Sequence, residues 1–416
     1  MSASTNSLPV SERIATLDIV RGFALMGILI MNMSLFSENG YSQAGGNDLW
    51  PSPFDSWTID VIDGLFSGKF NSMFSMLFGL GFTIQYARLQ QRFPDQATSI
   101  YVRRLLVLLV VGLIHFTLFW NGDVLHTYAL LGFLLIPLRR VSNRTILVLI
   151  AVCFLMPLVS NVIRLMTVSP ELIKAYTERA LAMGVTNEAA YGHGTFLDAA
   201  REHVRQADFM YGSWRALWGS LNWYTSVSVT MLMGVMIGRL GWARRIPELL
   251  PKIPRVQWGA LALGLVCSAA FSTIFHYNHG VPGPSLIKML GGFLYSLSRI
   301  SMMVFYVTTL VRIAQTATGS RRLAPFAAAG RMPLTNYLMQ TAICTTLFYH
   351  WGFGLWNTVN PIGQFAIAQL IFWVIQVPWS FWWLKHHERG PLEALWARLT
   401  YGGANRDAVL AHGRSM

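Results

Sequence analysis

Residues 13–36 read RIATLDIVRGFALMGILIMNMSLF, a run with the length and apolar content of a membrane-spanning helix. Asp18 and Arg21 are three residues apart, so a helix places both on one face, where their charges can neutralise each other. Asn32 follows roughly 21 Å farther along, at about 1.5 Å per residue. The run is either an ordinary first span with a tolerated amide or, because polar groups inside a membrane are costly, a span with a functional role.

The rest of the chain shares this apolar character. Its 416 residues are 53% hydrophobic and only 12% charged, whereas soluble domains are about 25% charged. The net charge of +13 comes from short Lys/Arg clusters between apolar runs, which is typical of topology signals. Because no nucleic-acid-binding motif accompanies the charge, we expect the lipid bilayer and not nucleic acid as the partner.

Cysteines and the N-terminal residues give no sign of secretion. Cys153, Cys267 and Cys344 all lie inside apolar runs without a partner in a loop, which argues against a disulfide framework. The first twelve residues are polar, and no small-residue cleavage site follows the first apolar run. We therefore expect an uncleaved first span.

Ten apolar runs are found with a window of about 19 residues. They lie at residues 14–36, 57–86, 100–120, 123–138, 145–165, 215–238, 257–277, 286–311, 332–351 and 361–384. The predicted fold class is an all-α polytopic membrane protein with about ten transmembrane helices. Its expected parts are a cytoplasmic tail (1–13), a five-helix membrane segment (14–165), an extracytoplasmic segment (166–213), a second five-helix segment (214–384) and a cytoplasmic amphipathic tail (385–416).

Lys and Arg occupy every second connection between these runs. The connections after the second, fourth, sixth and eighth runs contain Arg88, Arg92, Arg103, Arg104, Arg139, Arg140, Arg144, Arg239, Arg244, Arg245, Lys252, Arg255, Arg312, Arg321, Arg322 and Arg331. The alternate connections, around 37–56, 121–122, 278–285 and 352–360, contain no Lys or Arg. Because cytoplasmic loops are rich in these residues, the alternation predicts ten spans with both termini in the cytoplasm.

The long segment 166–213 is predicted to form two amphipathic helices, with Pro170 and Thr195 as their start signals. It is either a cap over a site on the outer face or an interfacial segment. The tail that begins at Lys385 is typical of a short amphipathic helix on the cytoplasmic surface.

Two cations lie within the predicted spans. Lys69 must pair, reach the membrane edge or face water, and its depth favours an ion pair. Asp63 is on a different face of the same predicted helix, so Asp18 or Asp123 on another helix is the expected partner. Arg299 lies near the middle of its span, and a fixed charge there indicates an anionic partner or ligand.

The stretch HFTLFWNGDVLHTYALLG, residues 115–132, is the richest in chemical groups. His115, Asp123 and His126 flank a predicted tight turn. A histidine oriented by a carboxylate is the usual general base, because its pKa of about 6.5 suits proton transfer at neutral pH. The alternative is that these histidines only make structural hydrogen bonds near the membrane surface.

Two other polar patterns have simpler interpretations. His276 and His279 are three residues apart on a Gly/Pro-rich loop without a nearby cysteine or acid, so we predict no metal site. Asn336 and Gln340 are four residues apart and share a helical face, which is more typical of hydrogen bonds between helices than of catalysis.

Several motifs together resemble the YeiB-like bacterial membrane proteins, a family without an assigned activity. They are RIATLDIVRGFALMGILIMN, GKFNSMFSMLFGLGF, GDVLHTYALLGFLLIPLRR, GRMPLTNYLMQTAICTTLFY and GPLEALWARLTYG, and the resemblance runs nearly end to end. The pattern of the first span, an Arg, then Leu-Asp, then Arg-Gly, is also similar to the wider transmembrane acyltransferase superfamily, which includes heparan-α-glucosaminide N-acetyltransferase. The resemblance implies a multi-pass protein of the bacterial cytoplasmic (inner) membrane.

The superfamily resemblance further implies an enzyme that takes an acyl group, acetyl in the expected case, from cytoplasmic acyl-CoA. The acceptor would be a hydroxyl or amine of a small molecule, glycan or lipid on the outer side. Asn32 stands at the position of a functional Asn of the heparan enzyme. The catalytic His of that enzyme lies in the next outer loop, but here loop 37–56 has no histidine, so His115 or His126 would supply the imidazole.

Such chemistry assigns provisional roles to the residues singled out above. The anionic CoA would bind at the cytoplasmic face, where Arg13, Arg21, Arg103, Arg104 and Arg331 are available. A histidine would remove the proton of the acceptor, and Asn32 could donate to the developing oxyanion.

Two other classes of function stay open. A transporter or channel for a small anionic solute or lipid would explain Lys69 and Arg299, and a non-enzymatic scaffold or sensor would use segment 166–213 as its binding surface. The sequence leaves a homodimer open as well.

Overall fold

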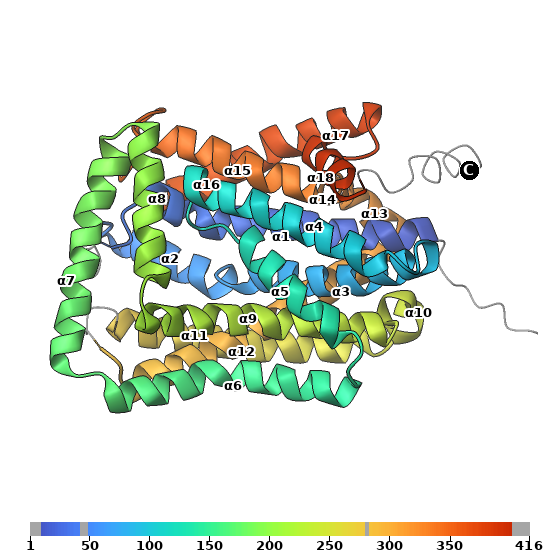
Figure 1. Cartoon of the computed structure of the whole chain (residues 1–416), viewed down its shortest axis with the longest axis horizontal. Helices are drawn as coiled ribbons and strands as arrows, with labels where there is room; N and C mark the ends of the chain where they lie inside the picture. The colour runs from blue at the N-terminus through green and yellow to red at the C-terminus, as the bar shows by residue number, and fades with distance from the viewer. Residues whose placement is uncertain (1–9, 42–48, 279–282, 402–416) are drawn as a thin grey trace, which may run out of the picture.

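The computed structural model describes residues 10–41, 49–278 and 283–401, without the side chains of residues 10–14 and 215. Long helices run side by side along one axis of the molecule, and two helices, α7 and α8, run across one end of this bundle (Figure 1). We call this the capped end and the opposite end, near α10 and α13, the open end. No strand occurs in the described ranges, which confirms the all-helical class.

The first half of the chain contains nine elements. They are α1 (Val10–Ser37), α2 (Pro53–Leu65), α3 (Lys69–Arg92), α4 (Ala97–Ile114), the π-helical turn η2 (His115–Phe119), α5 (Leu125–Leu138), α6 (Asn143–Thr167), α7 (Pro170–Asn187) and the π-helical turn η3 (Glu188–Gly192).

The second half continues from the capped end. Its elements are α8 (Phe196–Tyr211), α9 (Trp214–Arg239), the 3₁₀ turn η4 (Trp242–Arg244), α10 (Ile246–Leu249), α11 (Ile253–Asn278), α12 (Leu286–Ala314), α13 (Ala317–Arg322), α14 (Ala324–Gly330), α15 (Pro333–Phe348), α16 (Pro361–Leu370), the π-helical stretch η5 (Ile371–Gln376), α17 (Val377–His386) and α18 (Pro391–Tyr401).

Six helical segments in the described ranges are long and apolar enough to cross a membrane. They are Ala15–Ser37, Ala97–Phe119, Asn143–Thr167, Ile253–Asn278, Leu286–Ala314 and Pro361–His386. The other four predicted spans correspond to helices that are shorter, α5 with 14 residues and α15 with 16, or less apolar, α3 and α9. The count of ten spans and the orientation of the termini therefore stay predictions.

The predicted span 57–86 is not one continuous helix. α2 ends at Leu65, and α3 begins at Lys69 after a break around Gly68. Gly68 has φ +73°, and a Cβ atom there would lie 2.3 Å from the Tyr295 hydroxyl, so both the backbone and the space require glycine. This break, which local hydrophobicity does not reveal, places Lys69 at the start of a helix inside the bundle.

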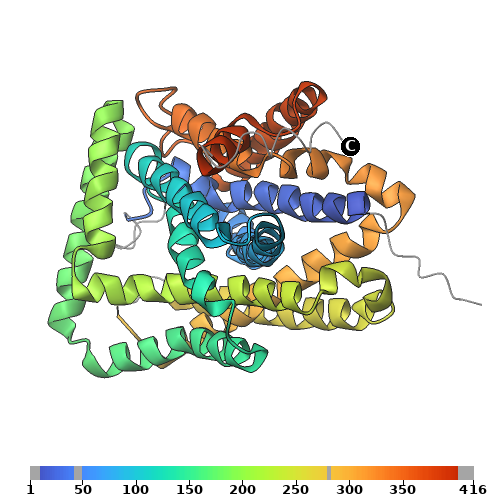
Figure 2. The ribbon, with the colours of Figure 1, turned by 45° about the vertical axis from the view of Figure 1, so that its right-hand side comes forward.

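The helix α1 lies at the centre of the bundle, between α14 to α16 on one side and α3 on the other (Figure 2). Gly22 and Gly330 allow α1 and α14 to touch, because a Cβ atom at either position would lie 1.9 Å from a backbone oxygen of the other helix. Close backbone approach at small residues is a common way for membrane helices to pack.

The segment at the capped end and the tail form helices as predicted. α7 begins at Pro170 after its cap, Ser169, and α8 begins with a capping box between Thr195 and Asp198. The tail helix α18 packs along α4, where the Trp396 indole N–H donates to the Arg104 backbone oxygen at 3.0 Å.

Candidate active site

Asp123 holds two imidazole rings at the capped end of the bundle. Its Oδ1 atom is 2.8 Å from His115 Nδ1, and its Oδ2 atom is 2.8 Å from His126 Nδ1. Oδ2 also accepts the backbone N–H of His126 at 2.9 Å, so Asp123 caps the first turn of α5. All three side chains are buried. The structure thus brings together the three residues that the sequence places on either side of a turn.

The hydrogen bonds to Asp123 determine what each imidazole can do. A carboxylate that accepts three N–H groups is stabilised in its ionised form. Because both Nδ1 atoms must then carry a proton, the Nε2 atoms of His115 and His126 are left as acceptors. An Nε2 atom in this state can receive a proton, and the nearby carboxylate stabilises the imidazolium that results.

The acceptor nitrogen of His115 faces a hydroxyl. His115 Nε2 is 2.9 Å from Thr341 Oγ1 on α15, so the Thr341 O–H donates to it. The neighbouring Thr345 and Thr346 instead donate to backbone oxygens of their own helix. Thr341 is not a candidate from the sequence, because nothing local distinguishes it from those two threonines. The chain Thr341–His115–Asp123 has the connectivity of a hydroxyl, a base and an orienting carboxylate.

His126 has a different environment on the side of α9. Its Nε2 atom is 3.4 Å from Thr127 Oγ1, which in turn accepts the Trp223 indole N–H at 3.3 Å. The Phe116 ring packs edge-on against the His126 ring. His126 Nε2 thus has only a long contact with a hydroxyl, at 3.4 Å, whereas His115 Nε2 is 2.9 Å from one, so His115 is the better placed of the two for proton transfer.

Asn32 is buried on α1 and shares a helical face with Phe36, four residues later. Phe36, one turn farther along, stacks on Trp120 at 4.1 Å between ring centroids, and Trp120 lies edge-on to His115. Within the described residues, no hydrogen bond joins the Asn32 amide to His115 or Asp123. The structure thus places Asn32 near the cluster without making it a member.

The helix α8 covers η2 and adds a third histidine to this region. His203 has no exposed surface, and neither of its ring nitrogens has a hydrogen-bond partner in the described part of the chain. Burial lowers the pKa of His203 to about 4, so this ring is neutral at pH 7. His203 is not among the candidate site residues that the sequence indicates.

Basic residues gather at the open end, around the start of α1. Arg21 pairs with Asp18 at 2.7 Å, in keeping with their spacing, and Arg104 lies near enough to Arg21 for their charges to interact. Arg331 lies close to Asp18 and also donates to the Glu388 backbone oxygen at 3.2 Å.

The other cationic candidates at the open end differ in how far their side chains are covered by the protein. The Arg104 guanidinium stacks on Trp396 of α18, 3.5 Å from the ring centroid, so the tail helix occupies one of its faces. Arg103 is exposed. The side chain of Arg13 lies outside the described residues.

Lys69 and Arg299 are buried in the middle of the bundle. The expected pairing of Lys69 with Asp18 or Asp123 is wrong, because Asp18 binds Arg21 and Asp123 binds the two histidines. Lys69 Nζ instead donates to the Asp63 backbone oxygen at 2.7 Å, which the helix break leaves without a helical partner.

Arg299, only 5% exposed, donates to the Ser226 backbone oxygen at 3.1 Å. Within the described residues, no carboxylate oxygen lies within 4 Å of the Lys69 or Arg299 cation.

Asn336 and Gln340 join helices, as their spacing suggests. Asn336 Nδ2 donates to the Ala329 backbone oxygen at 2.9 Å, and Gln340 Nε2 donates to the Leu25 backbone oxygen at 3.1 Å. Gln340 also bonds Gln376 on η5. These contacts satisfy backbone oxygens inside the bundle, which is a structural role.

The described residues contain no group of three or more His, Cys, Asp or Glu side chains that could hold a metal ion.

Comparison with known proteins finds relatives along almost the whole chain. The uncharacterised protein YxaH of Bacillus subtilis (strain 168) is 30% identical over 405 residues, which cover 94% of this chain and 95% of that protein. The uncharacterised protein YeiB of Escherichia coli (strain K12) is 29% identical over 409 residues, 94% of this chain and 97% of YeiB. The chain belongs to the YeiB-like family.

The remaining comparisons agree with membership of the YeiB-like family. Residues 237–403 match the family described as "Protein of unknown function (DUF418)". An uncharacterised 39.9 kDa protein encoded in the amylase 3′ region of Bacillus acidopullulyticus is 27% identical over 394 residues, 95% of each chain. No solved structure matches the chain.

Proposed function

We propose that this YeiB-like protein is a membrane acyltransferase that moves an acyl group from cytoplasmic acyl-CoA to a hydroxyl or amine acceptor. The observation that supports this function best is the buried chain Thr341–His115–Asp123, with distances of 2.9 and 2.8 Å between successive polar atoms. An imidazole whose Nε2 accepts from a hydroxyl and whose Nδ1–H is anchored by a carboxylate has the arrangement that a general base needs.

In this proposal the acceptor occupies the place of the Thr341 hydroxyl. Its O–H or N–H donates to His115 Nε2, and its oxygen or nitrogen attacks the thioester carbon of the acyl-CoA. His115 takes the proton and later gives it to the departing CoA thiolate, while Asp123 stabilises the imidazolium. The Asn32 amide supplies a donor to the oxyanion once acceptor and thioester are bound.

The acyl-CoA would enter from the open end. Arg21, Arg103 and Arg331 offer charge-assisted hydrogen bonds to its phosphates and carry the binding part of the proposal. Arg104 contributes from the side of α4, provided that α18 keeps its guanidinium in place.

Purified protein with radiolabelled acetyl-CoA tests the proposal. Binding raises the melting temperature by mass action, and transfer or hydrolysis releases free CoA. We expect Asp123→Asn and His115→Gln to lower the turnover rate by about 10² to 10⁴, the usual contribution of general base catalysis, with binding retained. His350→Gln, at an exposed histidine of the capped end, is the matched control and should keep wild-type turnover. If the folded protein binds no CoA thioester, the proposal is wrong.

A second candidate function is transport of a small anion. It is favoured by Lys69 and Arg299, two buried cations whose charges repel each other, because a bound anion would stabilise such a pair. The Asp63 carboxyl lies near Lys69, but no carboxylate oxygen of the described residues is within 4 Å of either cation. In proteoliposomes, Arg299→Leu should abolish anion flux, whereas Arg299→Lys, which keeps the charge, should retain part of it. Absence of flux for carboxylates, phosphates and inorganic anions alike would exclude this function.

A further inference from the structure

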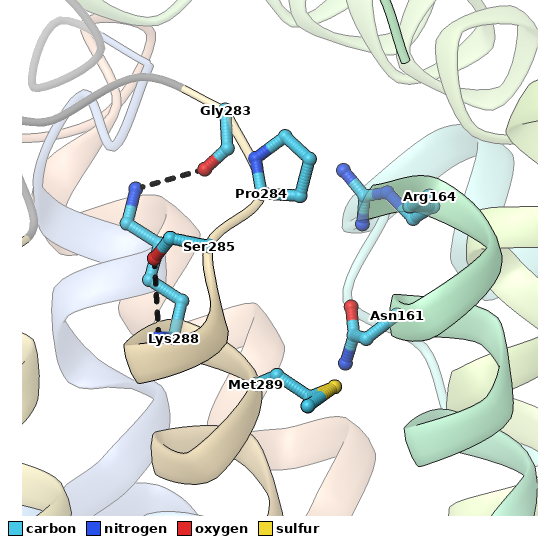
Figure 3. A pocket seen from close by; sticks show the side chains of 7 residues that line it. All are labelled: Asn161, Arg164, Gly283, Pro284, Ser285, Lys288 and Met289. Atoms are coloured by element: carbon cyan, nitrogen blue, oxygen red, sulfur yellow. Dashed lines mark hydrogen bonds between the residues drawn. The ribbon is translucent and has the colours of Figure 1, made fainter. Parts of the chain in front are cut away.

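Two adjoining cavities lie at the capped end of α6, α11 and α12, away from the histidine cluster. The first has a volume of about 190 Å³ and is lined by Asn161, Arg164, Gly283, Pro284, Ser285, Lys288 and Met289 (Figure 3). The second has a volume of about 270 Å³ and is lined by Phe271, Ile274, Phe275, Asn278, Lys288, Gly291 and Gly292. Lys288 lines both, so the two cavities meet at its side chain.

The first cavity has the groups that recognise a phosphate. Arg164 and Asn161 point into it from α6, opposite Pro284, Ser285 and Met289 (Figure 3). The Ser285 Oγ atom accepts the backbone N–H of Lys288 at 3.3 Å, which leaves the Ser285 O–H as a donor. The Lys288 ammonium lies at the edge of this cavity, where it donates to the Gly283 backbone oxygen at 3.2 Å (Figure 3). A guanidinium, an amide and a hydroxyl around one space, with an ammonium at its edge, suit an anion with several oxygens.

The second cavity is lined mainly by apolar side chains and by two glycines of α12. A side chain at Gly291 would narrow this slot, because a Cβ atom there would already lie 3.0 Å from Ile274 Cγ2. The slot is also placed among lipid-facing helices, since only 11% of the apolar window of α6 and 17% of that of α11 are buried within the protein. An acyl chain is the ligand that such a slot fits.

The two cations are also in an unusual place. Arg164 lies near the end of α6, just before α7, and Lys288 lies at the start of α12. The Lys/Arg clusters that predict topology lie at the opposite ends of the spans. Their positions are therefore not explained as topology signals. No carboxylate oxygen lies within 4 Å of the Arg164 guanidinium in the described ranges.

We propose that these cavities form a binding site for an anionic phospholipid, with the phosphodiester headgroup against Arg164, Asn161 and Ser285, the Lys288 ammonium at its edge, and an acyl chain in the slot beside Gly291. A zwitterionic lipid places a cationic amine next to the same two cations and binds less well. The site is separate from the histidine cluster, so this proposal does not depend on acyl transfer.

The test uses full-length protein in an uncharged detergent, titrated with phosphatidylglycerol or with phosphatidylcholine of the same chains. Melting temperature and native mass spectrometry report the bound lipid. We expect phosphatidylglycerol to stabilise the protein more than phosphatidylcholine. The double variant Arg164→Gln/Lys288→Gln should weaken phosphatidylglycerol binding by roughly 25-fold, about fivefold for each cation. Lys174→Gln, which removes one exposed positive charge on α7, should bind like wild type.

Two further arms separate the lipid from a free phosphate. Glycerol 3-phosphate tests the headgroup alone, and Gly291→Leu fills the slot while it leaves both cations in place. We expect Gly291→Leu to lose phosphatidylglycerol binding and to keep any weak binding of glycerol 3-phosphate. Equal stabilisation by both lipids, wild-type lipid binding in the double variant, or glycerol 3-phosphate as effective as the lipid would each overturn the proposal.

Discussion

At the scale of single residues, the histidines of this protein differ in what their surroundings allow. His115 and His126 share one carboxylate, whereas neither ring nitrogen of the buried His203 makes a hydrogen bond among the described residues. A neutral His203 is favoured in the folded state, and its protonation requires that the charged ring be taken into an apolar environment.

This difference predicts acid sensitivity. The pKa of His203 is about 4 in the folded state against 6.5 for a free imidazole, so the unfolded chain binds more protons between these values. Its contribution to stability is complete above pH 6.5 and falls as the pH drops toward 4, by up to about 3 kcal/mol. We expect His203→Gln to reduce the loss of melting temperature between pH 7.5 and 4.5, and His350→Gln to leave it unchanged. An equal loss in wild type and His203→Gln would contradict the assignment.

Gly68 gives a second prediction at this scale. An alanine there must adopt a left-handed backbone and place its Cβ atom against Tyr295, so Gly68→Ala should lower the free energy of unfolding by more than 1 kcal/mol, on the order of 1–3 kcal/mol. Gly81→Ala is the control, because a Cβ atom at Gly81 meets nothing within 4 Å and alanine favours a helix by about 0.5–1 kcal/mol. Thermal unfolding of both variants in detergent should therefore move in opposite directions.

At the scale of elements, broken helices expose backbone groups that side chains from other elements must satisfy. Where α14 ends and α15 begins, Asn336 satisfies the Ala329 oxygen. On the other side of this break, Glu393 of α18 accepts the backbone N–H groups of Leu334 and Thr335 at 2.6 and 3.1 Å. A carboxylate at a helix N-terminus is favoured by both hydrogen bonds and the helix dipole. The tail helix is therefore part of the bundle and not only a surface attachment.

We predict that Glu393→Ala loosens α18. The loss of a cap with two backbone hydrogen bonds should cost about 1–2 kcal/mol and make the C-terminal tail more sensitive to protease. Glu388→Ala is the control, since Glu388 is exposed and offers only its backbone oxygen to Arg331. Limited proteolysis of the purified protein measures both. Equal cleavage rates in the two variants would show that the cap does not hold the tail.

At the scale of the whole molecule, the histidine cluster lies toward the capped end, where η2 packs against α8, and the cavity lined by Arg164 lies where α6 ends before α7. The arginines around Asp18 lie on the other side of the bundle's length, since Asp18 is in the half of α1 that begins at the open end (Figure 1). Such separation suits a protein that joins a reactant on one side of a membrane to a reactant on the other. This function requires that the capped end and the open end face different compartments.

Topology is therefore the decisive prediction at this scale. In a variant without Cys153, Cys267 and Cys344, a cysteine at position 174 on α7 should react with an impermeant maleimide in intact cells. A cysteine at position 252, before α11, should react only after the membrane is permeabilised. If both cysteines are labelled in intact cells, the capped end and the open end do not face opposite sides of the membrane. Transfer across the membrane would then be excluded.

Part of this structure follows from local sequence alone. The Asp18–Arg21 pair and the His115–Asp123–His126 cluster each span a few residues, so helix geometry and one turn bring their members together. The all-helical class and the amphipathic helices α7, α8 and α18 follow from periodicity and start signals for the same reason.

The tertiary structure alone decides the rest. Thr341 meets His115 across 226 positions of sequence, and Glu393 caps α15 from 59 positions away. Likewise, the partner of Lys69 is a backbone oxygen that only the break between α2 and α3 exposes. Hydrophobic periodicity states which face of a helix is buried, but not which neighbouring helix covers it. Groups that depend on that neighbour are therefore set by packing.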